Sequence, residues 1–199
     1  MHNITRLKYG NTNTFLIRGE TGSLLIDTDY AGTLPAFYRA IKAQGIALSS
    51  ITHVLATHYH PDHMGLISSL VEQGVHLVLM ENQIEAVHFS DPLFARAGLS
   101  YTPIEEEKAL LLPFSKSRAF LQSLGVDGEM MPTFSHSGDG VCCVLDDGQC
   151  FVGDLEPLEY LAGYGENDAL RQDWQRIGQH HPRVIHFAHA PDRHMTEIM

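Results

Sequence analysis

The sequence predicts an α/β fold in which two mixed β-sheets pack face to face and helices cover their outer surfaces. The first observation is that the spacing of apolar residues switches repeatedly between the period of a strand and that of a helix along the 199 residues. The second is that the expected strands fall into two groups, each accompanied by helices. Because both sheets need an apolar cover, two stacked sheets with helices outside are the simplest arrangement that buries them.

The first group of strands lies before residue 80. Alternating residues predict strands at 14–18 and 23–27 around the turn at 19–22. An amphipathic helix follows, with apolar residues at helical spacing and a glycine at its end: Leu34, Phe37, Tyr38, Ile41 and Gly45. A strand at 51–56, a short helix around Ile67 that ends at Gly74, and a strand at 75–79 complete this group.

The second group lies beyond a stretch, 81–124, that is expected to be mostly helical with Ser115 and Ser117 as helix caps. Strands are predicted at 129–134, 141–145 and 150–152, the last two joined by a turn at 146–148. A last helix shows apolar residues at Leu170, Trp174 and Ile177, and a strand at 183–187 follows it.

Composition narrows the class of protein. A chain of this length with 44% apolar residues suits one compact domain, 1–199. The formal net charge of −11 argues against a nucleic-acid-binding protein, which needs a basic surface. No apolar run approaches the roughly 18 residues of a membrane span. The first residues resemble no signal peptide, so we expect a cytoplasmic protein with no membrane partner. Three cysteines, Cys142, Cys143 and Cys150, are expected to be reduced and buried.

Four metal-ligating side chains stand within six residues directly after the apolar strand 51–56. They belong to the segment His58-Tyr59-His60-Pro61-Asp62-His63. Pro61 keeps the chain before it extended, so His58 and His60 should point to the same side. Asp62 has the character of a helix N-cap, and Gly65 permits close approach of another segment. Imidazole and carboxylate groups without thiolate suit zinc, iron or manganese.

This segment matches the HxHxDH signature of the metallo-β-lactamase superfamily, and the resemblance extends along nearly the whole chain. Ile26-Asp27-Thr28-Asp29 resembles the family's Ile-Asp-Thr-Gly, with Asp27 as its buried acid and Asp29 in place of the glycine. His136 resembles the next histidine ligand, although Phe134-Ser135 stands where the family often has Pro-Gly. Asp154 resembles the bridging aspartate. The fold implied is the family's four-layer αβ/βα sandwich.

The last ligand of the family follows an apolar strand, where this chain offers two histidines. His189 fits better than His186 because it stands where the strand gives way to a loop. By resemblance, one group of residues would hold the first metal ion: His58, His60 and His136. A second group would hold the other: Asp62, His63 and His189. Asp154 would bridge two divalent ions, expected to be zinc, with iron or manganese as alternatives. Asp62 would also hand a proton to the leaving group as a catalytic residue.

The resemblance implies a small-molecule metallo-hydrolase, and its substrate stays open. An ester, a lactone or a thioester all suit a metal-activated water. Other classes remain as alternatives: a mononuclear iron redox enzyme similar to persulfide dioxygenases, and a non-catalytic metal-binding module. The chain has neither the flavodoxin segment nor the glutamate-containing signature of flavodiiron proteins. Because the sequence ends ten residues after His189, we do not expect the helical region that glyoxalase II adds.

One segment is predicted to set selectivity. Residues 84–118 lie outside every ligand position and combine apolar residues with four cations: Phe89, Phe94, Tyr101, Arg96, Lys108, Lys116 and Arg118. That mixture favours a pocket wall for an acyl or lactone substrate with one acidic end. Tyr160 or Tyr164 would orient a carbonyl if the protein works as lactonase-like relatives do. None of these features predicts the oligomeric state.

Overall fold

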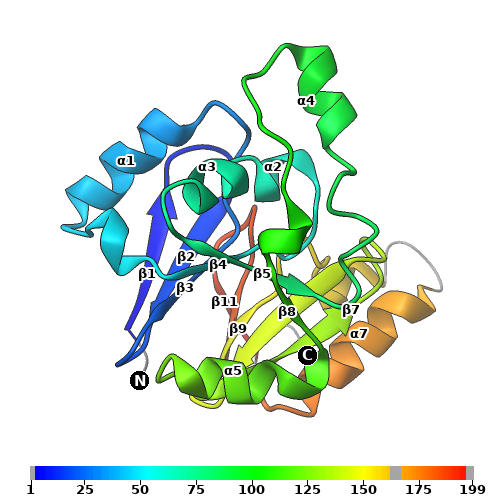
Figure 1. Cartoon of the computed structure of the whole chain (residues 1–199). Helices are drawn as coiled ribbons and strands as arrows, with labels where there is room; N and C mark the ends of the chain where they lie inside the picture. The colour runs from blue at the N-terminus through cyan, green and yellow to red at the C-terminus, as the bar shows by residue number, and fades with distance from the viewer. Residues whose placement is uncertain (1–2, 162–166, 196–199) are drawn as a thin grey trace.

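Two mixed sheets form the centre of the molecule in a computed structural model that describes residues 3–161 and 167–195 (Figure 1). Within those residues, the first sheet has six strands in the order β1-β2-β3-β4-β5-β6. The second has five, in the order β11-β10-β9-β8-β7. Both sheets mix parallel and antiparallel pairs, as the sequence predicts. No helix in the described part of the chain is both long and apolar enough to cross a membrane.

The first sheet begins with an antiparallel meander and continues with parallel strands. Its strands are β1 (Asn3–Lys8), β2 (Asn13–Arg18), β3 (Ser23–Ile26), β4 (His53–Leu55), β5 (His76–Met80) and β6 (Leu110–Leu112). The helices between them are α1 (Leu34–Ala43), α2 (Pro61–Met64), α3 (Ile67–Val71) and α4 (Asp91–Ala97). Parallel pairing from β3 to β6 places the carboxyl ends of these strands at one edge of the sheet.

The second sheet is reached through α5 (Ser117–Ser123). Its strands are β7 (Gly128–Thr133), β8 (Gly140–Leu145), β9 (Gln149–Phe151), β10 (Val184–His186) and β11 (Arg193–His194). Helix α7 (Asp168–Gly178) precedes β10, which pairs in parallel with β9. Short 3₁₀ turns also occur at Leu48–Ser50, Glu106–Lys108, Phe114–Lys116 and Leu158–Tyr160.

Alternation along the strands divides the core into three apolar layers. In β2, Phe15 and Ile17 face the second sheet, whereas Leu16 faces the layer that contains Phe37 of α1. In β8, Cys143 packs between the sheets and Cys142 packs toward α7. All three cysteines are free and buried, as expected. The order of layers is therefore helix, sheet, sheet, helix, which confirms the predicted sandwich (Figure 1).

The sequence missed three strands, β1, β6 and β11. Strand β6 contains only leucines, so no alternation marks it, and its pairing with β5 alone makes it a strand. The stretch 81–124, which contains β6, is predicted from the sequence to be mostly helical, and this prediction is wrong. Residues 81–90 form consecutive turns, and prolines at 103 and 113 lie where a helix would lose its backbone bonds. Only α4 and α5 are α-helical there.

The three predicted helix caps are also wrong. Ser115 lies inside the 3₁₀ turn Phe114–Lys116, and Lys116 occupies the cap position of α5. Ser117 is the first residue of α5, not its cap, because its hydroxyl accepts from the Met130 amide and donates to the Met130 carbonyl. Asp62 lies in the first turn of α2, and His60 occupies the cap position. Pro61 explains the shift, since its fixed φ makes it the first helical residue.

Candidate metal centre

Seven predicted ligands come together at the edge where the carboxyl ends of β4, β7, β9 and β10 meet. They are His58, His60, Asp62, His63, His136, Asp154 and His189. Three overlapping groups among them have ligand atoms within 4.8 Å of one another: His58, His60 and His136; His58, His63 and Asp154; Asp62, His63 and His189. Residues separated by more than a hundred positions thus meet in one place because the strands that carry them end at one edge.

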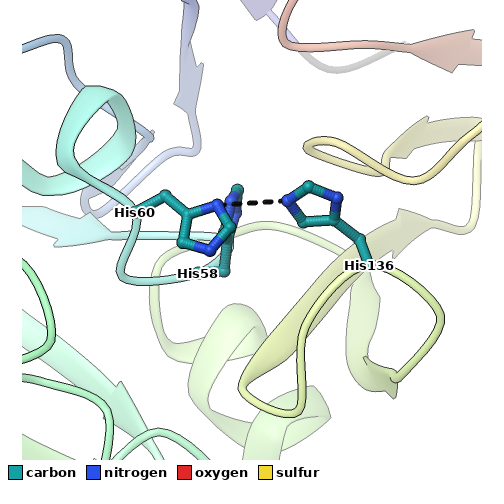
Figure 2. Close-up of side chains that lie close together, drawn as sticks. All are labelled: His58, His60 and His136. Carbon is teal, nitrogen blue, oxygen red and sulfur yellow. Dashed lines mark hydrogen bonds between the residues drawn. The ribbon is translucent and has the colours of Figure 1, made fainter.

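The first group consists of the histidines that follow β4 and β7 (Figure 2). Its imidazole rings face one another, with His136 Nε2 3.2 Å from His60 Nδ1. The centroid of the His58 ring lies 4.4 Å from that of His60 and 4.7 Å from that of His136. Three ring nitrogens at such separations can surround one small cation.

The second group lies on the opposite side of Asp154. Asp62 Oδ2 is 3.1 Å from His189 Nε2, and Asp62 Oδ1 is 3.9 Å from His63 Nε2. His63 is fully buried, whereas His189 is more than one-third exposed. This group therefore combines one interior ligand with one at the surface.

Asp154 stands between the two groups and turns one oxygen to each. Its Oδ2 lies 3.9 Å from His58 Nε2 and 3.7 Å from His136 Nε2. Its Oδ1 lies 3.4 Å from His63 Nε2 and 3.2 Å from His189 Nε2. A carboxylate placed in this way can contact two cations at once.

Buried polar atoms at the centre show that the residues suit a cation. His58 Nε2, His63 Nε2 and Asp154 Oδ1 are buried without a hydrogen-bond partner among the described residues. Leaving such atoms unpaired costs about 1–3 kcal/mol each, a cost that coordination would remove. All three belong to the groups whose ligand atoms converge, and nitrogen and carboxylate donors without thiolate fit zinc or a similar divalent ion.

The surroundings of the two buried histidines shift their pKa values in opposite directions. They keep His58 in the first group neutral and favour positive charge at His63 in the second. Burial and the neighbouring His63 lower the pKa of His58, so this imidazole stays neutral. Burial alone would lower the pKa of His63 too, but the carboxylates of Asp27 and Asp154 raise it to about 10. A proton or a metal cation beside His63 is stabilised by the same two carboxylates.

Asp27 orients the buried histidine of the second group. Its Oδ2 lies 3.1 Å from His63 Nδ1, which leaves His63 Nε2 facing Asp154. Its two oxygens also accept from the amide and the hydroxyl of Thr57. The backbone of Asp27 has φ 60°, which ends β3 one residue earlier than predicted and turns the side chain into the site. The buried acid expected from the family resemblance thus contacts a candidate ligand directly.

Two glycines permit segments to approach the site closely. A side chain at Gly65 would meet the Ala31 amide nitrogen at 2.2 Å, which agrees with the close approach that the sequence suggests. Gly153 has φ +59°, and a Cβ there would lie 2.4 Å from the Thr57 hydroxyl. The loop that carries Asp154 can therefore lie directly against the end of β4 only with glycine at 153.

The backbone between His58 and His60 is fixed from two directions. The amide of Tyr59 donates to Asp139 Oδ2 at 2.7 Å, and its carbonyl accepts from the Ser90 hydroxyl at 2.6 Å. Buried Gln83 donates to the carbonyls of Ala56 and Asp139. The turns at 81–90 are thus bonded to the first metal-ligand loop.

Asp173 of α7 fixes the loop before His136. Its carboxylate is fully buried and accepts from the amides of Phe134, at 2.9 Å, and Ser135, at 2.8 Å. It also pairs with Arg176, which lies over the Phe134 ring. Sequence reasoning missed this residue, although a signal exists. Asp173 occupies an apolar position in the helical repeat of Leu170, Trp174 and Ile177, where a carboxylate needs a buried partner.

The structure separates the two histidines near the end of the chain. His189 reaches the cluster from a loop that Asn13 fixes through bonds to the carbonyls of Phe187 and Ala190. His186 points elsewhere, with its ring stacked on Phe151 and its Nε2 2.7 Å from Gln149 Oε1. Of the two histidines, His189 is thus the one that lies beside the other candidate ligands.

Cavities open on both sides of the cluster. One, of about 290 Å³, includes His136, Asp154, His189 and Tyr160 in its lining. The other, of about 510 Å³, is lined by Tyr59, His60, Asn82, Glu85, Ala86, Phe89, Ser137, Gly138 and Asp139. Tyr160 is thus near the site, as suggested, and Tyr164 lies outside the described residues.

The predicted selectivity segment 84–118 contributes only its beginning to these cavities. Glu85, Ala86 and Phe89 line the larger one, whereas Phe94 is buried in the core against Tyr101. The expected cations lie elsewhere or are paired. Lys108 bonds Glu105, and Arg118 bonds Glu129 and Asp146. The prediction of a pocket wall is therefore supported for residues 85–89, whereas the rest of the segment and its four cations line neither cavity.

The fold is an α/β sandwich whose histidine–aspartate cluster could hold metal ions. Sequence comparison identifies the family. A profile described as the metallo-β-lactamase superfamily matches residues 7–189, so the chain belongs to that superfamily. An archaeal superfamily protein from Sulfolobus tokodaii has a similar structure. Its TM-score is 0.71 at 15% identity, over 98% of this chain and 82% of that one.

Two curated relatives show how widely functions differ among similar chains. A protein named atrochrysone carboxyl ACP thioesterase, from Emericella nidulans, is 25% identical over 185 residues, which are 90% of this chain and 51% of that protein. A putative diflavin flavoprotein A 2 from Synechocystis is 34% identical over 91 residues, 45% of this chain and 15% of that protein. The chain spans about half the length of the first relative and less of the second.

Proposed function

We propose that this protein is a metal-dependent hydrolase with a dinuclear centre. His58, His60 and His136 hold one divalent ion, and Asp62, His63 and His189 hold the other. Asp154 bridges them. The observation that carries this proposal is the placement of the two Asp154 oxygens, one toward each histidine group. Zinc is the proposed metal because the donors are imidazole and carboxylate.

When bound, two divalent ions lower the pKa of a water molecule toward neutrality and polarise a carbonyl group. The protein supplies the proton path and the ligand geometry. Without a metal ion, the hydrogen bond from His189 and the charge of His63 outweigh burial and lower the pKa of Asp62, and a bound cation would act in the same direction, so the carboxylate is ionised at neutral pH. Asp62 can therefore take a proton from the attacking water first and then return it to the leaving group.

The proposed substrate is a small molecule with an ester, lactone or thioester bond. Cavities of a few hundred cubic ångströms on either side of the cluster suit such a substrate. The thioesterase name of one relative favours including thioesters. The net charge of −11 supports the proposal that nucleic acid is not a partner. Three free buried cysteines support a reducing, cytoplasmic location.

Metal analysis with a substrate panel tests the proposal. Protein purified without chelator should contain about two zinc ions per chain and should hydrolyse at least one of a set of matched chromogenic esters, lactones and thioesters. Chelation should abolish the activity and added zinc should restore it. Protein that contains no transition metal and takes up none on reconstitution would refute the dinuclear hydrolase.

A redox enzyme is the second candidate, favoured by the flavoprotein name of the Synechocystis relative. A mononuclear iron enzyme would use the three histidines of the first group and leave the second group without a metal. One iron per chain, oxygen consumption with a persulfide substrate, and no hydrolysis of the panel would establish it over the hydrolase. Two zinc ions with hydrolysis would exclude it.

A further inference from the structure

The larger cavity beside the metal centre has an aromatic wall that continues from a candidate ligand. The Phe89 side chain is 56% exposed, although it belongs to a turn bonded into the fold. The centroid of its ring lies 5.4 Å from that of His60, at an interplanar angle of 37°. A molecule bound at His60 would therefore extend across the face of Phe89 and cover apolar surface there.

Apart from any metal ion at His60, the charged side chains that line this cavity are acidic. Glu85 is exposed in its lining, and no lysine or arginine lines it among the residues that the structure describes. Asp139 also lines the cavity, but its Oδ2 already accepts from the Tyr59 amide. Glu85 is thus the carboxylate best placed to meet a ligand in this cavity.

The smaller cavity also offers few positive charges to an anionic group of a substrate. Arg193 lines it, and its guanidinium bonds Glu159. Glu156 lines the same cavity and brings a further carboxylate. Since the whole chain carries a net charge of −11, the long-range field also attracts cations toward the molecule and repels anions.

We propose that the cavity formed by Phe89 and Glu85 binds a positively charged nitrogen group attached to an apolar or aromatic stem. The inference rests on the proposed hydrolase, and it specifies the substrate as an ester, lactone or thioester whose acyl or leaving group carries an amine or quaternary ammonium. The stem packs on Phe89, whose ring face also attracts cations, and the charge pairs with Glu85. This reverses the acidic-ended substrate expected from the sequence.

A binding experiment tests this without depending on turnover. Zinc-loaded protein is titrated with 4-phenylbutylamine, 4-phenylbutanoate and 4-phenylbutanol, three probes that share one stem and differ in charge. One exposed ion pair and one cation–π contact predict that the amine binds roughly three- to tenfold more tightly than the alcohol, whereas the carboxylate, which can coordinate zinc directly, reports on access to the metal. The same order should appear in KM for panel substrates that carry these groups.

Variants separate the local carboxylate from the overall charge. Glu85→Gln should remove most of the preference for the amine, and Glu85→Lys should reverse it. Glu20→Gln is the matched control, because it changes the net charge equally in the β2–β3 turn, at the end of the sheet opposite the cluster. Phe89→Ala should weaken all three probes. Metal content is measured for each variant.

The outcomes distinguish the inference from the proposed function. Preferential amine binding that depends on Glu85, in a protein that hydrolyses no panel member, would support the cavity and refute the hydrolase. Hydrolysis with no preference for cationic substrates, or equal effects of Glu85→Gln and Glu20→Gln, would refute the cavity proposal and leave the hydrolase standing.

Discussion

Replacing Asp173 should weaken metal binding at the first group although this residue contacts no candidate ligand. Its carboxylate accepts two backbone amides immediately before His136. Hydrogen bonds to a charged group are worth about 1.5–3 kcal/mol each, so Asp173→Ala should destabilise the fold by about 3–5 kcal/mol. The loop would then lose the restraint that keeps His136 beside His60 and His58.

Asp173→Asn should be far milder. A side-chain amide oxygen at the position of Oδ2 still accepts from the amides of Phe134 and Ser135, which lie 2.9 Å and 2.8 Å from it. Its NH₂ group would then face Arg176 without attraction. We expect a loss of about 1–2 kcal/mol, because the two backbone bonds persist without their charge.

The assay follows stability and metal binding separately. Urea denaturation gives the free energy of unfolding, and chelator competition gives the affinity of each metal position. Loss of a residue that orients a ligand typically lowers affinity about 10–100-fold, which we expect for the first ion in Asp173→Ala. The control is Asp168→Ala, which removes an exposed acid from the same helix.

A purely structural role for Asp173 would give a different result. Asp173→Ala would then be less stable but would bind both ions, when folded, with the affinity of the unmodified protein. Equal weakening of both metal positions would also contradict the reasoning, because only the first group contains His136.

Three further predictions follow from the same geometry. Asp154→Ala should abolish hydrolysis and lower bound metal below two ions per chain while circular dichroism shows a folded protein; full metal content by elemental analysis would contradict its bridging place. His186→Ala should keep both ions, since this ring packs on Phe151, and metal loss would mean that the last ligand is wrongly chosen. His88 pairs with Asp91 and Glu106, which raise its pKa above the ordinary 6.5. A raised pKa contributes stability below about pH 6.5 that disappears as pH rises through the higher folded-state value, so His88→Gln should destabilise the protein slightly at pH 5.5 and not at pH 9. An unfolding free energy changed equally at both pH values would contradict that assignment.

Periodicity in the sequence predicts the α/β class with mixed sheets, and the resemblance to a known family adds the four-layer sandwich and the set of candidate ligands. The alternation of apolar and polar residues in strands and their 3.6-residue repeat in helices can be recognised within a short stretch of sequence, without knowledge of the rest of the chain. The cluster at 58–63 is local in the same sense. The resemblance to the metallo-β-lactamase superfamily pointed to His136, Asp154 and His189, each near the end of a predicted strand, and the structure gathers them at one edge.

Only the tertiary structure shows which residues orient those ligands and which side chains line the cavities beside them. Asp139 meets Tyr59 across 80 positions of sequence, and Asp173 meets Ser135 across 38. Strand β6 exists because β5 pairs with it. The charge of the larger cavity depends on which side chains line it, and Arg118 is not among them but pairs with Glu129 and Asp146. Such contacts join segments with no shared local signal, so their partners become visible only when packing brings them within hydrogen-bond distance.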